Sequence, residues 1–427
     1  MTEQVAARPS LTIRSFGCRL NIAESEAIRS ALIPTIDTPT VVINGCAVTG
    51  NAMRETATAA RRARKDNPDA RVIVTGCAAQ VDPGRFAAMA EVDRVLGNAE
   101  KFDPALYHGS DSGLSRTIVG DAMALTRTAP QLVPAFAEHA RGFLEVQNGC
   151  DHRCTFCIIP YGRGPSRSVP VAQAVEAAQR LADGGHAELV LTGVDLTSYG
   201  HDLPDQPSLA TLIRAILDGV PAVQRLRLGS IDVAEIDDAL FELLTGEPRM
   251  MPHVHLSLQH GDDLMLKRMK RRHNRAEAVT MVERLKSARP AIAIGADLIA
   301  GFPTEDESAA QANETLIADC DIVFAHIFPY SPREGTPAAR MPQLPRSDIK
   351  VRAAALRAAG EAHRRDWLTS LVGTRQTLLV ERDGQSGHAD NFARVRLSRA
   401  TTAGAIIAAD IIGLDERGLI GKEAQHD

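Results

Sequence analysis

The stretch that decides the fold reads Val146-Gln147-Asn148-Gly149-Cys150-Asp151-His152-Arg153-Cys154-Thr155-Phe156-Cys157. It follows an apolar strand pattern and places three cysteines on one loop with the spacing C-x3-C-x2-C. Three thiolates are one ligand short of a closed tetrahedral site, so an iron–sulfur cube held here keeps one iron open for chemistry. Zinc with His152 as the fourth ligand is the rival, although zinc sites usually pair cysteines with distant partners.

Three further cysteines, Cys18, Cys46 and Cys77, each follow a glycine at the end of an apolar strand pattern. The predicted strands are Leu11–Phe16, Thr40–Asn44 and Arg71–Thr75, and the predicted helices between them are Glu24–Leu32 and Ala52–Lys65. Strand–helix alternation implies a parallel sheet, in which the carboxyl ends of the strands meet at one edge. These three cysteines are therefore expected to converge on a second site, rather than to be separate buried thiols. The seventh, Cys320, has no partner in the pattern and is interpreted as a core thiol.

The composition is that of a globular protein with several domains. The 427 residues are 44% apolar and 24% charged, with a net charge of −5, which argues against a generally basic nucleic-acid coat. No apolar run is long enough for a membrane span, and the first ten residues lack the signal-peptide pattern. A cytoplasmic location is expected, where clustered cysteines more often bind metal than form disulfides.

The strand pattern resumes six times in the middle of the chain, which predicts a partial or complete parallel β/α barrel with its site on the loops after the strands. The first of these loops carries the C-x3-C-x2-C run. The predicted strands are 143–148, 188–192, 225–230, 253–258, 294–299 and 321–330, and an amphipathic helix over 347–371 follows them. The fold class is therefore α/β. The predicted domains are 9–122, a linker at 123–140 with Pro130 and Pro134, 141–371, and a small all-β barrel at 372–423.

Cations in and before the terminal barrel are candidates for RNA contacts. Barrels of this kind often bind nucleic acid, and Arg394, Arg396 and Arg399 lie in its predicted strand region. The alternative is a small appended barrel with solvated arginines. A basic run after the fourth barrel strand either neutralises phosphates or forms a solvated helix face; it comprises Lys267, Arg268, Lys270, Arg271 and Arg272.

The cysteine loop, with Phe156 before its third cysteine, resembles the radical S-adenosylmethionine (AdoMet) superfamily. Strand-end phrases that match the superfamily are Leu191-Thr192-Gly193-Val194, Arg227-Leu228-Gly229-Ser230-Ile231 and the segment 295–303. The resemblance implies a 4Fe-4S cluster on Cys150, Cys154 and Cys157. It also implies AdoMet contacts at Phe156, Thr192, Gly193 and Ser230. The implied chemistry is reductive cleavage of AdoMet to a 5′-deoxyadenosyl radical, with electrons from an unidentified low-potential donor.

The order of the three domains resembles the methylthiotransferases along nearly the whole chain. Matching phrases are Phe16-Gly17-Cys18-Arg19-Leu20-Asn21, Cys157-Ile158-Ile159-Pro160-Tyr161-Gly162-Arg163-Gly164 and the segment 328–336. The resemblance implies a second 4Fe-4S cluster on Cys18, Cys46 and Cys77, a terminal RNA-binding TRAM barrel, and a tRNA anticodon loop as the substrate. Two AdoMet molecules are then used per turnover, one for methylation of a sulfur and one for the radical.

Three branches of that family act on isopentenyladenosine in tRNA, on threonylcarbamoyladenosine in tRNA, and on an aspartate of a ribosomal protein. The first typically has Gln-Met-Asn after the first cysteine, whereas this chain has Arg19-Leu20-Asn21. The segment Arg19-Leu20-Asn21, together with the residues around Cys46 and Cys77, is most similar to the threonylcarbamoyladenosine branch. Departures from that pattern at Gly45, Gly162, His260 and Thr304 remove no cluster ligand. An iron–sulfur RNA-binding protein without enzymatic activity is the alternative from another class.

Overall fold

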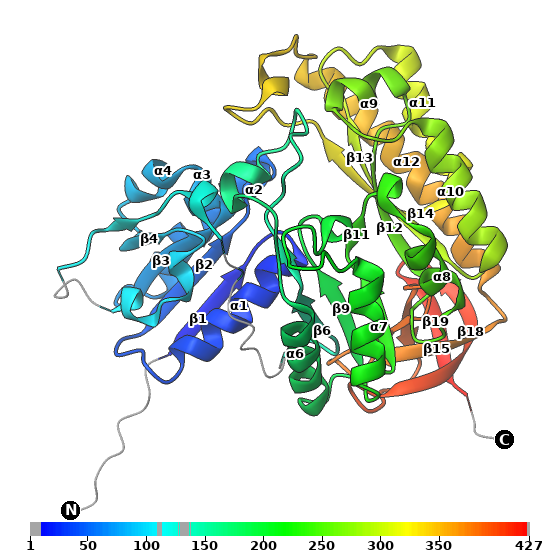
Figure 1. The fold of residues 1–427 in the computed structure, drawn as a ribbon, viewed down its shortest axis with the longest axis horizontal. Helices are drawn as coiled ribbons and strands as arrows, with labels where there is room; N and C mark the ends of the chain where they lie inside the picture. Colours follow the sequence, from blue (N-terminus) through cyan, green and yellow to red (C-terminus); the bar gives the residue numbers. More distant parts are fainter. Residues whose placement is uncertain (1–9, 109–112, 127, 129–135, 137, 425–427) are drawn as a thin grey trace, which may run out of the picture.

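The computed structural model describes residues 10–108, 113–126, 128, 136 and 138–424, and Figure 1 shows three parts in chain order. Pro130 and Pro134 of the predicted linker, and most of the first ten residues, lie outside the described residues. None of the helices in the described part of the chain has the length and apolar character that a membrane crossing requires.

The first part is a parallel sheet with the order β1-β2-β3-β4-β5. One face is covered by α1, whose Ile28 and Leu32 pack on Val42, and the other by α2. The register pairs Ser15 with Asn44 and Gly45 with Gly76, so the three strands end level with one another. The elements are β1 (Leu11–Ser15), α1 (Arg19–Leu32), β2 (Thr40–Gly45), α2 (Gly50–Asp66), β3 (Arg71–Gly76), α3 (Cys77–Val81), α4 (Pro83–Ala87), β4 (Arg94–Leu96) and β5 (Thr117–Ile118).

The second part is a partial barrel of parallel strands around the largest apolar core. Its strands form two sheets, β6-β9-β10 and β11-β12-β13-β14, which are separated at Gly229. The strands are β6 (Gly142–Glu145), β9 (Glu188–Thr192), β10 (Arg225–Leu228), β11 (Ser230–Ile231), β12 (His253–Gln259), β13 (Ala293–Ala300) and β14 (Ile322–Pro329). A short ribbon of β7 (Gln147–Asn148) and β8 (Arg167–Ser168) flanks them. The helices are α5 (Ile159–Arg163), α6 (Val171–Asp183), α7 (Leu209–Gly219), α8 (Asp238–Gly246), α9 (Asp263–Met269), α10 (Arg275–Ala288), α11 (Glu307–Asp319) and α12 (Arg346–Ser370).

The third part is a closed barrel with the strand order β15-β16-β17-β19-β18. It lies against the amino ends of the partial-barrel strands. At this interface Arg227 of β10 donates to the backbone oxygens of Ala389 and Asp390 at 2.8 and 2.7 Å. Phe392 packs beside them under His253, with ring centroids 4.9 Å apart. The strands are β15 (Arg375–Val380), β16 (Ser386–Ala389), β17 (Arg394–Leu397), β18 (Ile406–Asp415) and β19 (Gly418–Glu423).

The predicted α/β class, with a partial β/α barrel and a terminal β-barrel, is confirmed. Some helices and strands begin or end at residues other than those predicted from the sequence. Helix α1 begins at Arg19 instead of Glu24, because Gly17 has φ +98° and turns the chain directly into the helix. Cys18 is therefore the residue that precedes the first helical turn. Cys320 directly follows α11 and is fully buried, and the sixth barrel strand begins after it.

Candidate functional site: two cysteine triads around one cavity

The dispersed triad gathers at the carboxyl edge of the first sheet. Cys18, Cys46 and Cys77 follow β1, β2 and β3, and a Cβ added to Gly17 would lie 2.8 Å from Cys46 Sγ. Burial, together with the nearby charges of Cys77 and Cys18, raises the pKa of Cys46 to about 12. A thiol in such a place stays protonated unless a metal replaces the proton. Cys46 and Cys77 are buried and Cys18 is exposed, and three thiols gathered in this way fit an iron–sulfur group better than a free nucleophile.

The compact triad lies on the loop between β7 and α5, at the carboxyl end of the partial barrel. Burial, together with the nearby charge of Cys154, raises the pKa of Cys157 to about 12. Asp195 follows β9, and its Oδ2 lies 3.7 Å from Cys150 Sγ and 3.0 Å from His152 Nε2. His152 is thus paired with a carboxylate in this structure, and with Asp195 and Glu235 it forms a group whose possible ligand atoms lie within 4.8 Å of one another.

The end of α9 holds this loop from the other side. Thr155 donates through its backbone nitrogen to Met269 oxygen at 3.1 Å and through its hydroxyl to Arg268 oxygen at 2.8 Å. Arg271 Nη1 lies 3.6 Å from Cys154 Sγ, and its Nη2 donates to Asp232 at 2.8 Å. Arg271 belongs to the basic run for which the sequence predicts contact with solvent or phosphate. Only the fold shows that its cation faces a thiol of the compact triad.

A cavity of 170 Å³ is lined by residues of the first domain and of the partial barrel, including residues close in sequence to cysteines of both triads. The first domain contributes Val48 and Thr49, which come just after Cys46. The partial barrel contributes Phe156, next to Cys157, together with Asp297 and Tyr330. The domains are joined beside it by the Gly50 amide, which donates to Ser331 Oγ at 3.1 Å. A molecule in this cavity would contact the loops of both triads at once.

The predicted AdoMet contacts occupy separate places around the barrel mouth. Phe156 lines the cavity, whereas Thr192, Gly193 and Ser230 lie on neighbouring strand ends outside its lining. Gly193 packs closely on Gln147, where an added Cβ would lie 2.9 Å from Oε1. That oxygen accepts from the amides of Val194 and Asp195 at 2.9 and 2.8 Å, which fixes the turn after β9.

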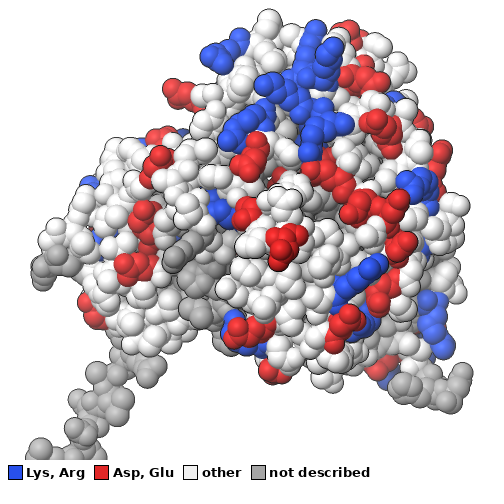
Figure 2. Space-filling model, in the orientation of Figure 1, with Lys and Arg blue, Asp and Glu red and all other residues white. Residues whose placement is uncertain are grey.

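The candidate RNA-contacting cations divide into paired and unpaired groups. On β17, Arg394 is exposed, whereas Arg396 forms an ion pair with Asp415; Arg399 is also exposed. In the basic run, Arg272 pairs with Glu235 at 2.6 Å, while Lys267 and Lys270 are exposed. Figure 2 shows Lys and Arg side chains gathered over the region where Figure 1 places α9.

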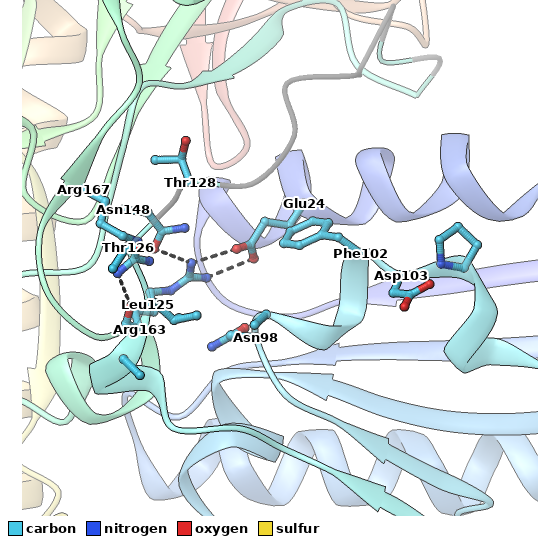
Figure 3. A pocket seen from close by; sticks show the side chains of 13 residues that line it. Glu24, Asn98, Phe102, Asp103, Leu125, Thr126, Thr128, Asn148, Arg163 and Arg167 are labelled. Atoms are coloured by element: carbon cyan, nitrogen blue, oxygen red, sulfur yellow. Dashed lines mark hydrogen bonds and ion pairs between the residues drawn. The ribbon is translucent and has the colours of Figure 1, made fainter. Parts of the chain in front are cut away.

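A buried ionic network locks the two cysteine domains together (Figure 3). Arg163 of α5 donates to both carboxylate oxygens of Glu24 of α1 at 2.9 and 3.0 Å, and Lys101 lies 2.7 Å from the same carboxylate. All three side chains are at most 2% exposed. Arg163 and Lys101 hold the pKa of Glu24 at about 2, although burial alone would raise it. This network forms one wall of a second cavity, of 630 Å³, between the domains.

Replacing Arg163 by Met is expected to lower the free energy of unfolding by about 3–5 kcal/mol, because it removes a buried charge from a paired set. Urea denaturation followed by circular dichroism measures the change. Arg62→Met is the matched control, since Arg62 is exposed on α2 of the same domain. Equal midpoints for the two variants would contradict a structural role for the network.

Comparisons with known proteins agree with this architecture. Residues 144–314 match the model of the radical SAM superfamily, and residues 10–97 match that of the uncharacterized protein family UPF0004. A curated relative from Rickettsia prowazekii (strain Madrid E), threonylcarbamoyladenosine tRNA methylthiotransferase MtaB, is 46% identical over 95% of both chains.

The chain belongs to the threonylcarbamoyladenosine tRNA methylthiotransferase family. A relative of the same name from Bacillus subtilis (strain 168) is 34% identical over 80% of this chain and 78% of its own. Among solved structures, the radical AdoMet methyltransferase TsrM from Kitasatospora setae shares the fold, with a TM-score of 0.56 and 16% identity over 78% of this chain and 75% of that chain. This family member is therefore a radical SAM transferase, with AdoMet and a 4Fe-4S cluster as cofactors.

Proposed function

We propose that this chain is a tRNA (N6-L-threonylcarbamoyladenosine(37)-C2)-methylthiotransferase. It inserts a methylthio group at carbon 2 of the modified adenosine beside the anticodon, in the cytoplasm, with electrons from a low-potential donor. The observation that carries the proposal is the cavity that Thr49 and Phe156 line from opposite domains. A reaction that joins a radical centre to a sulfur source needs the target base within contact distance of both.

The two triads are assigned to two 4Fe-4S clusters. Cys150, Cys154 and Cys157 hold the cluster that, when reduced, supplies an electron for AdoMet cleavage, with Arg271 as a neighbouring positive charge. Cys18, Cys46 and Cys77 hold the auxiliary cluster that carries sulfur. Each set offers three thiols, and the seventh cysteine, Cys320, lies in the barrel core, which suits clusters that keep one iron open.

The residues of the cavity and its rim bind and orient the reactants. Phe156 offers an aromatic face beside the compact triad, and Thr192, Gly193 and Ser230 contact AdoMet from the strand ends. The network of Arg163, Glu24 and Lys101 keeps the two domains at one separation. Such rigidity matters because a displacement of about 1 Å can cost about a hundredfold in rate.

The terminal barrel contributes to tRNA binding. Arg394 and Arg399 are exposed and have no ion-pair partner within the described residues, so their charges are available to phosphates. The charge of Arg396 is compensated by Asp415, and its contribution to affinity is expected to be the smallest of the three.

Mass spectrometry of tRNA nucleosides from cells that lack this gene tests the proposed function. The expected result is loss of the 2-methylthio group from threonylcarbamoyladenosine, with restoration by the wild-type gene. Loss from isopentenyladenosine instead, or unchanged tRNA together with an altered ribosomal protein, would assign the chain to another branch. Unchanged products in all three classes would favour an iron–sulfur RNA-binding protein.

A further inference from the structure

Arg19 extends from the first domain toward the interior of the partial barrel. It is the first residue of α1, directly after Cys18, and its guanidinium carbon lies 5.8 Å from the ring of Phe392. Its charged neighbours are Arg141, Glu188 and Asp297, all of which belong to the barrel. The side chain is half-buried, yet no hydrogen bond or ion pair of its guanidinium occurs within the described part of the chain.

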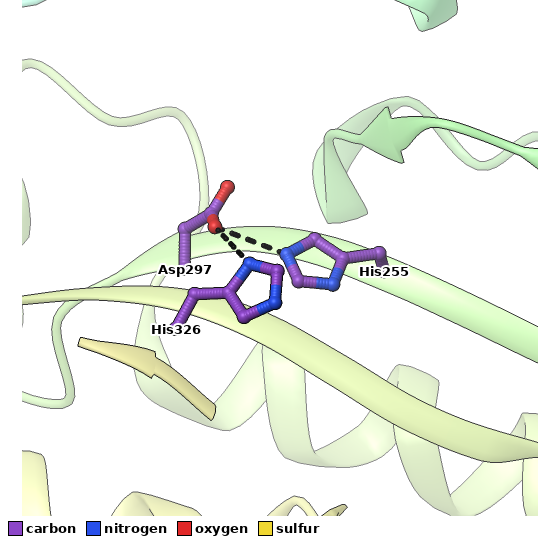
Figure 4. Close-up of side chains that lie close together, drawn as sticks. All are labelled: His255, Asp297 and His326. Atoms are coloured by element: carbon purple, nitrogen blue, oxygen red, sulfur yellow. Dashed lines mark hydrogen bonds and ion pairs between the residues drawn. The ribbon is translucent and has the colours of Figure 1, made fainter. Parts of the chain in front are cut away.

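The acidic neighbours of Arg19 are already engaged by other groups. Glu188 is fully buried and lies 2.8–2.9 Å from the Nε atoms of Arg141, Arg225 and Arg227. Asp297 accepts at one carboxylate oxygen from His255 at 3.0 Å and faces His326 Nδ1 at 3.3 Å (Figure 4). Neither carboxylate compensates Arg19 at ion-pair distance. The contact of Arg19 with the Phe392 ring provides no hydrogen bond and no opposite charge. A half-buried guanidinium without a hydrogen-bond or ion-pair partner is costly, and an anionic ligand would relieve that cost.

Asp297 connects this region to the reaction cavity, because it lines the cavity that lies between the two triads. His326 adds a largely exposed imidazole, with 58% of its side chain accessible, on the edge strand β14. A ligand in the cavity therefore meets the carboxylate of Asp297, which His255 and His326 contact from outside the cavity lining. Arg19 lies among the charges around that carboxylate.

We propose that Arg19 binds the carboxylate of the threonylcarbamoyl group and thereby selects the anionic substrate over an uncharged one. This inference rests on the proposed function. The substituent and the reacting carbon are attached to one six-membered ring, so the group that recognises the substituent must lie close to the one that supplies sulfur. The backbone of Arg19 follows Cys18 in the chain, and its guanidinium has Asp297, which lines the cavity, among its charged neighbours. Guanidinium is suited to carboxylates, since its planar fork donates two parallel hydrogen bonds.

Two anticodon stem–loop RNAs of one sequence test the proposal with the reconstituted full-length protein. One carries threonylcarbamoyladenosine, and the other carries its threoninamide analogue, in which a neutral amide replaces the carboxylate. For the wild type, kcat/KM for the 2-methylthio product is expected to favour the acid by about ten- to a hundredfold, the range of a charged hydrogen bond. Arg19→Gln is expected to reduce that ratio to about one, and Arg19→Lys to retain part of it.

The control is Arg62→Gln, which removes an exposed cation from the same domain and is expected to keep the wild-type ratio. An Arg19→Gln variant that loses activity equally toward both RNAs would overturn the proposal, because that is the result for a phosphate contact or for damage to the neighbouring cluster. The equilibrium affinities of the two RNAs give the same comparison without turnover. The affinity ratio can therefore be measured even for a variant with reduced iron content. Wild-type protein without product on either RNA refutes the proposed function itself.

Discussion

Replacing Cys154 by Ala is expected to abolish AdoMet cleavage by the reconstituted protein, with a loss of more than about a hundredfold. Removal of an outer contact to a metal ligand already costs about 10–100-fold, and removal of the ligand costs more. Cys154 is one of the three thiols of the compact loop, and the Arg271 cation beside it cannot replace a thiolate as a ligand. Measurement of 5′-deoxyadenosine after addition of a strong reductant checks the result.

Cys320→Ala is the matched control for that experiment. Its thiol is fully buried at the end of α11, where it packs in the barrel core away from both triads. The variant should retain iron and AdoMet cleavage at a modest cost in stability, as expected for a small truncation in a core. Comparable cleavage by the Cys154→Ala protein would show that the compact triad is not the site of AdoMet cleavage.

Replacing Cys46 by Ala is expected to separate the two halves of the reaction. Iron and sulfide should fall from about eight to about four of each per chain, because one of two four-iron clusters is lost. AdoMet cleavage should persist, since Cys46 lies in the first domain, across the cavity from the compact loop. Transfer of the methylthio group should disappear. Chemical iron and sulfide analysis, Mössbauer spectroscopy and product analysis measure these quantities.

A Cys46→Ala protein that keeps about eight irons would disprove the auxiliary cluster on this triad. Loss of both clusters together would instead indicate that the first domain fails to fold. The Cys77→Ala variant distinguishes these cases. Cys77 is the first residue of α3, and its thiol accepts a hydrogen bond from Asn98 Nδ2 at 3.8 Å, whereas Cys46 lies on a loop beside Gly17. Because the two cysteines have different surroundings, the same loss of four irons in both variants is expected only if both cysteines hold one cluster.

The sequence was sufficient for the fold class and for the grouping of the cysteines. Three successive strands each end in a glycine followed by a cysteine. In a parallel sheet these three cysteines are expected to lie close together, because the strand ends meet at one edge. The C-x3-C-x2-C spacing is local, so the proximity of Cys150, Cys154 and Cys157 needs no knowledge of distant contacts. The alternating pattern likewise predicts the parallel strands on which both loops depend.

Long-range pairing explains what sequence analysis missed. Arg163 was part of a motif, but its buried carboxylate partner is Glu24, 139 residues away. Arg271 belonged to a basic run that suggested solvent or phosphate, and the fold turns it toward Cys154. Glu145 is another such residue, since burial and the nearby charge of Glu24 raise its pKa to about 7. Charges distant in sequence reveal their roles only when packing removes water and chooses their partners.

The amino-acid sequence by itself determined the two sets of thiols, the parallel strands that carry them and the family, because these depend on spacing along the chain. Only the tertiary structure decided that residues close in sequence to Cys46 and Cys157 line one cavity and that Arg163 joins the two domains. It also decided that Arg19 has Asp297 as a charged neighbour without forming an ion pair or hydrogen bond in the described part of the chain. The physical reason is that burial and ion pairing are properties of surfaces brought together by folding, and no local pattern records which surfaces meet.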